Sequence, residues 1–375
     1  MLLRDIVPSI ASQTRMRSLG AQAPRMRAGP ALSDLAAHPA PTPLLRAGRL
    51  PLALLLLVAL VVVAIGVGRY PLSPVEVLRV LWLHVAGEAT NSVADAIVWQ
   101  IRLPRIGVSM LVGAALAAAG AAFQQLFRNP LVAPDTLGVS SGAALGAVLA
   151  ILFGAGFAVI QLAAFAGGLA AVGIVMLIAS RLTAHDALVT LILTGVVVAS
   201  LLGAGISFAK YVADPYNTLP AITFWLMGSF ASSTWRELAA IALPAGAAFV
   251  VLALLAWRID VLALPEDEAR ALGVRTRLLR GAVIAAATLA TAAAVAVSGI
   301  IGWVGLVVPH MARRIAGPRF ARLLPLSAVA GAAFMVVIDT IARVAVVSEL
   351  PPGILTAIVG TPVFIALLAR TRQAL

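Results

Sequence analysis

The chain has 375 residues, of which 62% are hydrophobic and only 11% are charged, and its net charge is +12. Soluble domains are nearer half apolar and a quarter charged, so this composition excludes an ordinary soluble protein and indicates a polytopic membrane protein. The positive charge comes from arginine, since Lys210 is the sole lysine, and the arginines gather at the ends of apolar segments. That distribution is typical of membrane topology and argues against nucleic-acid binding.

The sequence also excludes several kinds of chemistry. It contains no cysteine, which removes disulfides, thiolate metal sites and thiol nucleophiles. It has no G-x-x-x-x-G-K-[ST] phosphate loop, because the single lysine is followed by Tyr211. We therefore expect no catalytic site, cofactor or metal in this chain. If transport consumes ATP, a partner ATPase binds the ATP and Mg²⁺.

Residues 1–49 differ in composition from the rest of the chain. They hold seven arginines and six prolines, and the first strongly apolar run begins only at Leu50. A signal peptide would place its apolar core directly after the first arginines. We expect a flexible cytoplasmic tail over 1–49 and a membrane domain over 50–375.

A helix needs about 20 apolar residues to cross the hydrocarbon core. The apolar segments predict an all-α protein with about ten spans, which puts both termini on one side of the membrane. The spans are expected near 50–69, 105–126, 139–155, 159–180, 187–209, 238–257, 280–298, 300–315, 324–342 and 353–370.

The charges in the loops indicate the orientation. One set of loops carries mainly arginine, whereas the other set mixes basic and acidic residues evenly. By the positive-inside rule the arginine-rich loops and both termini are cytoplasmic. The arginine-rich set comprises Arg128, Arg181, Arg258, Arg270, Arg275, Arg277, Arg280, Arg313, Arg314, Arg319, Arg322, Arg370 and Arg372.

The segment 258–280 is the most informative loop, since nine of its 23 residues are charged. A block this polar lies in water between two spans. Residues 267–272 favour a short helix that ends at Gly273. An amphipathic helix between two spans gives a soluble partner a surface on which to push.

Small residues dominate several spans, notably 113–122 and 331–333. Small faces allow helices to approach closely in a membrane, where lipid supplies no hydrophobic drive between them. Close helix packing is therefore expected at these segments.

Several motifs follow one another in a familiar order. They are WQIRLPR (99–105), LVGAAL (111–116), FRNPLVAPD (127–135), LGVSSGA (137–143), WLMGS (225–229), ARALG (269–273), GLVVPH (305–310), DTIAR (339–343), ELPPG (349–353) and GTPVF (360–364). Together they resemble the FecCD-type permeases of ABC importers, which carry iron–siderophores, haem or cobalamin. The resemblance covers roughly 50–375.

The resemblance implies ten helices arranged as two inverted repeats, and a homodimer with the pathway at its interface. It also implies two copies of a cytosolic ABC ATPase and a periplasmic substrate-binding protein. Proline-bearing breaks at Asn129-Pro130 and Pro309-His310 give a hint of the inverted repeat.

Three arginines are expected at the outer face. Arg102 and Arg105 lie at the outer end of the second span, and Arg343 at that of the ninth. The resemblance implies that they pair with acidic residues of the binding protein, which would favour orientation and association rate. Snorkelling or an internal pair is the alternative, because Asp339 and Arg343 stand at i and i+4.

The resemblance makes 260–273 the coupling helix that enters a groove of the ATPase. A helix lying on the membrane surface is the alternative. The coupling residues are expected to be Leu264, Glu268, Ala269, Arg270, Leu272 and Gly273.

A cytosolic gate is implied where the fourth and fifth spans meet. Counting back from Gly195 places it at Leu188 and Val189. Hydroxyl residues are familiar there in the family, whereas this chain has aliphatic residues next to Thr190. A hydrophobic constriction can gate by dewetting.

We therefore expect a permease subunit in the bacterial inner membrane that moves an iron chelate, ferric siderophore or haem, into the cytoplasm by alternating access. Cobalamin or molybdate is the alternative cargo. An ion-coupled secondary transporter would need a charged residue in mid-span, which is not seen. An intramembrane enzyme or cytochrome would need catalytic or haem-ligating pairs, and His310 is expected to be a packing residue.

Overall fold

The computed structural model describes residues 49–371, apart from 89–91, 183–186, 263 and 347. All of them belong to the second of two units of the chain, residues 44–375. The tail predicted over 1–49 therefore lies outside the described residues, except for Arg49.

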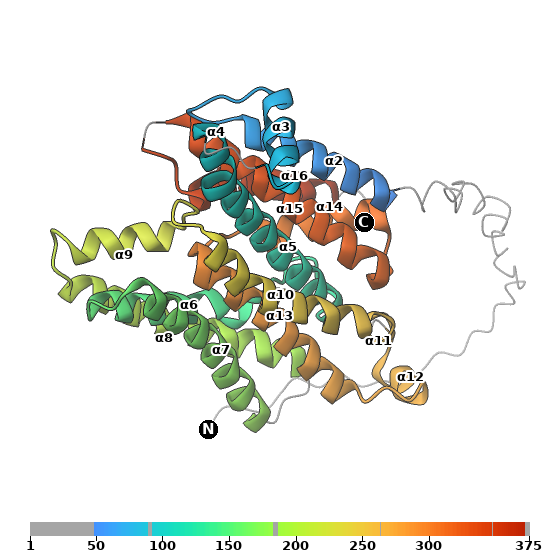
Figure 1. Cartoon of the computed structure of the whole chain (residues 1–375). Coiled ribbons are helices and arrows are strands. Elements are labelled where there is room, and N and C mark those ends of the chain that lie inside the picture. The colour runs from blue at the N-terminus through green and yellow to red at the C-terminus, as the bar shows by residue number, and fades with distance from the viewer. Residues whose placement is uncertain (1–48, 89–91, 183–186, 263, 347, 372–375) are drawn as a thin grey trace, which may run out of the picture. The chain divides into compact units, whose positions relative to one another are not determined.

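The described residues form helices joined by turns, with no strand among them (Figure 1). This confirms the all-α class. The helices are α2 (Arg49–Gly66), α3 (Pro74–Val85), α4 (Val93–Ala96), the π-helix η1 (Ile97–Arg102), α5 (Leu103–Leu126), the 3-10 helix η2 (Pro134–Leu137), α6 (Val139–Leu152), α7 (Phe157–Arg181), α8 (Ala187–Val212), α9 (Thr218–Met227), α10 (Trp235–Leu254), α11 (Ala256–Val261), α12 (Glu266–Ala271), α13 (Thr276–Ser298), α14 (Val304–Ala316), α15 (Phe320–Ala345) and α16 (Pro352–Thr371).

Seven helical segments in this part of the chain are long and apolar enough to cross a membrane. They are 49–66, 93–126, 157–181, 187–212, 235–254, 276–298 and 320–345. Three further apolar helices are shorter: Val139–Leu152, Thr218–Met227 and Pro352–Ala366. The membrane class is confirmed, whereas the count of ten spans stays a prediction.

Two of the predicted spans, the third and the eighth, are short helices in the structure. The expected span 300–315 becomes α14, which has 13 residues and carries Arg313 and Arg314 in its last turn. Its helix runs through Pro309, so the predicted break at Pro309-His310 is wrong; the backbone instead turns just before α14, at Trp303, where φ is +70°. The expected span 139–155 becomes α6, with 14 residues.

Several of the described helices were not expected, and α3 and α9 are the longest of them. The start of α3 is encoded locally, because the Ser73 side chain accepts a hydrogen bond from the amide of Glu76 and Pro74 occupies the first turn. The turn before α9 is also encoded locally, because the amide of Asn217 donates to the Asp214 carboxylate at 2.7 Å.

The centre of the bundle is formed by α5 and α13, whose apolar stretches are 78% and 72% buried. Helix α5 crosses α15 at Gly113 and Gly331, and it crosses α14 at Gly120 and Gly305. A Cβ on Gly113 would overlap the carbonyl oxygen of Gly331, so these backbones touch directly. The close packing predicted from the small residues at 113–122 and 331–333 is confirmed.

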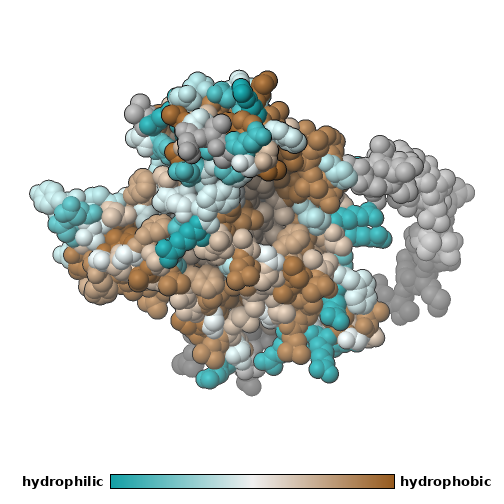
Figure 2. Space-filling model, in the orientation of Figure 1, coloured by the Kyte–Doolittle hydropathy of each residue, from teal (hydrophilic) through white to brown (hydrophobic). Residues whose placement is uncertain are grey.

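The outer helices expose apolar side chains. Helices α2, α7, α8 and α10 bury only 17–28% of their apolar stretches. Figure 2 shows hydrophobic residues over much of the visible face and hydrophilic residues gathered toward its ends. Such a surface suits lipid or another helix rather than water.

Candidate functional site

Four charged side chains pair at one end of the bundle. Arg105, in the first turn of α5, contacts Asp339 of α15 through Nε and Nη2, both at 2.9 Å from Oδ1. The Arg105 Nη1 also pairs with Glu349 at 3.0 Å. Arg343, one turn beyond Asp339, lies 3.3 Å from its second oxygen. Two positive and two negative charges thus neutralise one another in a site where Asp339 is fully buried.

Arg102 has a different role beside this cluster. It ends the π-helix η1, and its guanidinium donates to the carbonyl oxygens of Ile65 and Tyr70. Ile65 belongs to the last turn of α2, whose carbonyls have no partner within the helix. Arg102 therefore caps the carboxyl end of α2 and ties it to α5.

The three arginines predicted to dock the binding protein are all buried in this structure. Arg102, Arg105 and Arg343 are 5%, 7% and 7% exposed. Arg105 and Arg343 form internal ion pairs, which was the alternative to docking. Of the four charged side chains in these pairs, Glu349 is the one that reaches the surface, at 34% side-chain exposure. Docking through these arginines stays a prediction, with the added condition that the internal pairs open first.

Helix α12 lies at the opposite end of the bundle (Figure 1). Its first turn holds Glu266, Asp267 and Glu268, and Arg270 lies in its last turn. This order complements the helix dipole, which helps so short a helix to form. Gly273, with φ +77°, donates its amide to the carbonyl of Arg270 and ends the helix as predicted.

Glu266 anchors α12 to the start of α13. Its carboxylate accepts from the Thr276 hydroxyl at 3.1 Å, and it lies 2.7 Å from Arg270 and 3.6 Å from Arg280. The hydrogen bond from Thr276, aided by the two arginines, lowers the pKa of Glu266 below its ordinary value. The carboxylate therefore stays charged at neutral pH.

The predicted coupling residues divide into outward and inward positions. Leu264 and Leu272 are 37% and 54% exposed, and Glu268, Arg270 and Gly273 are also exposed. Ala269 is only 1% exposed and packs into the bundle. The segment 264–273, which contains α12, thus turns charged and apolar side chains outward, while Ala269 packs inward.

Arg128 clamps the chain just before α12, a contact that sequence reasoning missed. It follows α5, has φ +50°, and donates to the carbonyl of Leu262 from Nε at 3.1 Å and from Nη2 at 2.7 Å. A further hydrogen bond joins its Nη2 to the carbonyl of Leu264. Arg128 therefore connects α5 to the segment that leads into α12.

A second missed network surrounds Asp260 on α11. Its carboxylate accepts from the amide of Phe320 at 2.8 Å and lies 3.5 Å from the Gln125 amide nitrogen. Gln125 in turn accepts from Arg313 at 2.7 Å. Burial raises the pKa of Asp260, although the Phe320 amide and the charges of Arg319 and Arg313 oppose the shift. One carboxylate thus joins α5, α11, α14 and α15. The sequence offered part of the signal for this network, because the adjacent residues Gln124 and Gln125 lie in an apolar span and need polar partners.

The predicted gate residues lie at the start of α8. Leu188 lines a cavity of about 470 Å³ together with Glu266, Arg270, Arg277 and Arg280. Val189 is 49% exposed and does not line that cavity. The structure therefore places one predicted gate residue, Leu188, on the same cavity as one predicted coupling residue, Arg270, although the two are far apart in sequence.

No group of three or more potential metal ligands occurs among the described residues. Of the histidines in that part of the chain, His84 stacks on Trp99 with ring centroids 3.9 Å apart and lies 3.4 Å from Asp95, and His310 is half-buried in α14. His185 lies outside the described residues.

The multi-span helical bundle has ion pairs at one end and a short exposed helix, held by Arg128, at the other, and this arrangement suits the membrane component of a transporter. The comparisons agree. Residues 55–370 match the FecCD transport family, and the chain belongs to that family.

Two relatives and one solved structure indicate the breadth of the family. The molybdate import permease MolB of Haemophilus influenzae is 39% identical over 85% of this chain and 94% of its own length. The cobalamin import permease BtuC of Halobacterium salinarum is 45% identical over 73% and 74% of the two chains. A structure titled as an inward-facing, metal-chelate type ABC transporter matches with a TM-score of 0.78 and 38% identity, covering 86% of this chain and 98% of the other.

These findings establish the general function of the chain. The chain is a multi-pass permease subunit of an ABC importer in the inner membrane, and the ATPase activity resides in a separate subunit.

Proposed function

We propose that this permease carries an iron chelate from the periplasm to the cytoplasm. A relative named for iron chelatin transport in Helicobacter pylori supports this cargo, with 39% identity over 77% of this chain and 87% of its own length. The cargo would cross between two copies of the chain by alternating access, with both termini on the cytoplasmic side.

Molybdate is the second candidate cargo. One observation favours it: the molybdate permease MolB aligns over 94% of its own length. An oxyanion and a large chelate differ greatly in size, so one pathway should not suit both. Uptake of each cargo in the presence of the other would distinguish the candidates.

The mechanism assigns a role to each end of the bundle. An ABC ATPase dimer binds α12 through Leu264, Glu268, Arg270 and Leu272, and it moves α12 when ATP closes the dimer. Arg270 lines the same cavity as Leu188 of α8, and Arg128 passes this movement to α5 through its hydrogen bonds. Transmission requires continuous contacts of this kind.

A loaded binding protein docks at the end that carries Arg102, Arg105 and Arg343. Because these arginines are buried, we propose that docking engages Glu349 first and competes for its pair with Arg105. Glu349→Gln should then slow association with the binding protein at low salt. Unchanged association would remove this route.

The decisive experiment reconstitutes the chain in liposomes with its ATPase and its binding protein, and measures uptake and ATP hydrolysis. The cargoes are a ferric siderophore, haem, cobalamin and molybdate. Stimulation by the siderophore or haem alone supports the proposal, and stimulation by molybdate alone replaces it with the second candidate. Arg270→Glu should abolish stimulation, while Arg181→Gln, at the end of α7, serves as the control.

A further inference from the structure

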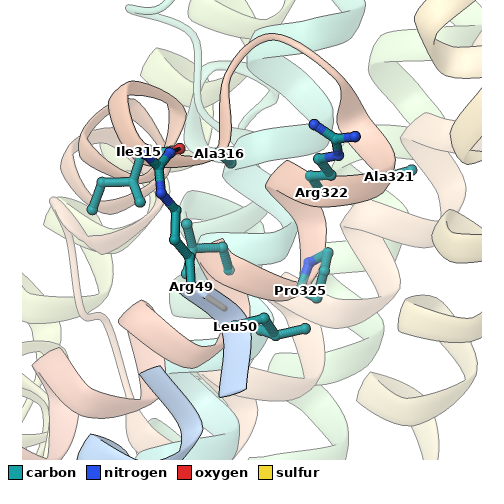
Figure 3. Close-up of a pocket in the computed structure, with 8 residues that line it drawn as sticks. Arg49, Leu50, Ile315, Ala316, Ala321, Arg322 and Pro325 are labelled. Atoms are coloured by element: carbon teal, nitrogen blue, oxygen red, sulfur yellow. Dashed lines mark hydrogen bonds between the residues drawn. The ribbon is translucent and has the colours of Figure 1, made fainter. Parts of the chain in front are cut away.

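A pocket at the α12 end of the bundle is lined by none of the side chains that form the ion pairs, the Arg128 clamp or the Asp260 network. It encloses about 240 Å³ and is lined by Arg49, Leu50, Ile315, Ala316, Ala321, Arg322, Pro325 and Leu326. Figure 3 shows that these residues come from the start of α2, the end of α14 and the start of α15. Three helices that are distant in sequence thus form one recess.

The lining is basic, with no carboxylate. Arg49 and Arg322 are its two charged residues. Arg49 donates from Nη1 to the carbonyl of Ile315, which holds its guanidinium at the rim and leaves its other nitrogens available. Within the described part of the chain, the exposed guanidinium of Arg322 has neither a hydrogen-bond partner nor an ion-pair partner. An anion would complete this site.

The pocket also lies at the level of the membrane boundary. Arg49 and Phe320 are the first residues of two membrane-capable helices. Both helices direct their amino ends toward the pocket, so their dipoles favour an anion as well. Basic pockets between the ends of membrane helices are suited to anionic headgroups.

The walls are apolar and continue onto the exposed surface. Leu50, Pro325 and Leu326 line the pocket below the arginines. One turn farther along α2, Leu54 is 46% exposed, and one turn back along α14, Met311 is 49% exposed. A ligand here would meet charge at its head and an apolar surface along its tail, which distinguishes a lipid from a soluble phosphate.

We propose that this pocket binds the phosphate headgroup of an anionic phospholipid. Arg322 and the remaining nitrogens of Arg49 hold the phosphate, and the acyl chains lie along α2 and α14. The proposal requires neither the ATPase nor a particular cargo, so its failure and that of the transport proposal are separate.

A second basic pocket offers a contrast. It lies between Arg258 and Arg275, encloses about 330 Å³, and includes Gly273 at the end of α12. Because it adjoins the proposed ATPase contact, a protein partner would cover it. The lining of the pocket at Arg49 and Arg322 includes no residue of α12 or of the segments that flank it.

Lipid binding to the purified full chain in detergent, measured by native mass spectrometry, tests the proposal. Phosphatidylglycerol is titrated against phosphatidylcholine, and glycerol 3-phosphate is added as the soluble phosphate. We expect the wild type to prefer phosphatidylglycerol. Arg322→Gln should reduce that preference about fivefold, the effect of one arginine near a headgroup, and Arg49→Gln with Arg322→Gln should reduce it further.

The controls separate a site from general charge. Arg181→Gln removes an exposed arginine from the end of α7 and should leave the preference unchanged. Arg322→Lys keeps the positive charge and should retain most of the preference for phosphatidylglycerol. An unchanged preference in Arg322→Gln, or an equal loss in Arg181→Gln, would overturn the site. Displacement of the lipid by millimolar glycerol 3-phosphate would overturn the lipid as its ligand.

Discussion

The guanidinium of Arg128 and the carbonyl oxygen of Leu262 are joined by two hydrogen bonds, of 3.1 and 2.7 Å. Arg128 follows α5, and Leu262 lies between α11 and α12. At 1.5 Å per residue, Arg105 at the other end of α5 is about 35 Å away. One rigid helix therefore links the α12 clamp to the buried ion pairs.

Replacement of Arg128 by glutamine should uncouple transport from ATP hydrolysis. Glutamine cannot reproduce the fork that reaches Leu262 and Leu264, and hydrogen bonds to charged groups contribute about 1.5–3 kcal/mol. We expect a several-fold fall in cargo moved per ATP hydrolysed in liposomes. Arg181→Gln is the matched control, and an unchanged ratio in Arg128→Gln would show that the clamp carries no movement.

Asp339→Asn should destabilise the bundle strongly. It leaves Arg105 and Arg343 buried without their shared carboxylate, and breaking a buried pair costs about 3–5 kcal/mol. The apparent unfolding midpoint in detergent should fall well below that of Glu349→Gln, because Glu349 is partly exposed. Equal midpoints for the two variants would contradict the buried-charge argument.

Gly113→Ala should impair folding, because the added methyl group would overlap the carbonyl of Gly331. Overpacking of this kind costs about 1–3 kcal/mol. Gly246→Ala is the control, since nothing lies within 4 Å of the methyl group it adds to α10. Thermal unfolding should separate the two variants. A stable Gly113→Ala protein would mean that α5 and α15 can move apart without penalty.

The anchoring of α12 by Glu266 should be insensitive to pH between 5.5 and 8. A carboxylate with a lowered pKa stabilises the fold above its unfolded pKa of about 4.3, and this stabilisation is lost only as pH falls through the still lower folded value. Glu266→Gln removes the anchor at every pH. The ratio of ATPase stimulation in the wild type to that in Glu266→Gln should therefore stay constant. If the ATPase stimulation of the wild type approached that of Glu266→Gln as the pH fell to 5.5, the anchoring would be pH-sensitive and the prediction wrong.

Much of the fold could be predicted from composition, because hydropathy averaged over a span is a robust signal. The short helices could not, since α6 and α14 have 14 and 13 residues and their ends depend on packing. The turn before α14 contains Gly302, but nothing in the sequence indicates that Trp303 itself takes the positive φ.

The site was predictable only where its parts are local. The end of α12 at Gly273 follows from neighbouring residues, and so does the i,i+4 pair of Asp339 and Arg343. The pair between Arg105 and Asp339 spans 234 positions, so no local pattern could reveal it. The same holds for the Arg128 clamp, whose partners are backbone carbonyls that carry no sequence signature.

The glycine contacts of α5 with α14 and α15 have a consequence for experiments on the working transporter. At these glycines backbone contacts backbone, so no side chain can adopt another rotamer to accommodate a small shift of the helices. The three helices should keep their mutual distances through the cycle. Because the chain has no cysteine of its own, pairs of spectroscopic labels on these helices would provide a fixed reference frame against which the movement of α8 and α12 can be measured.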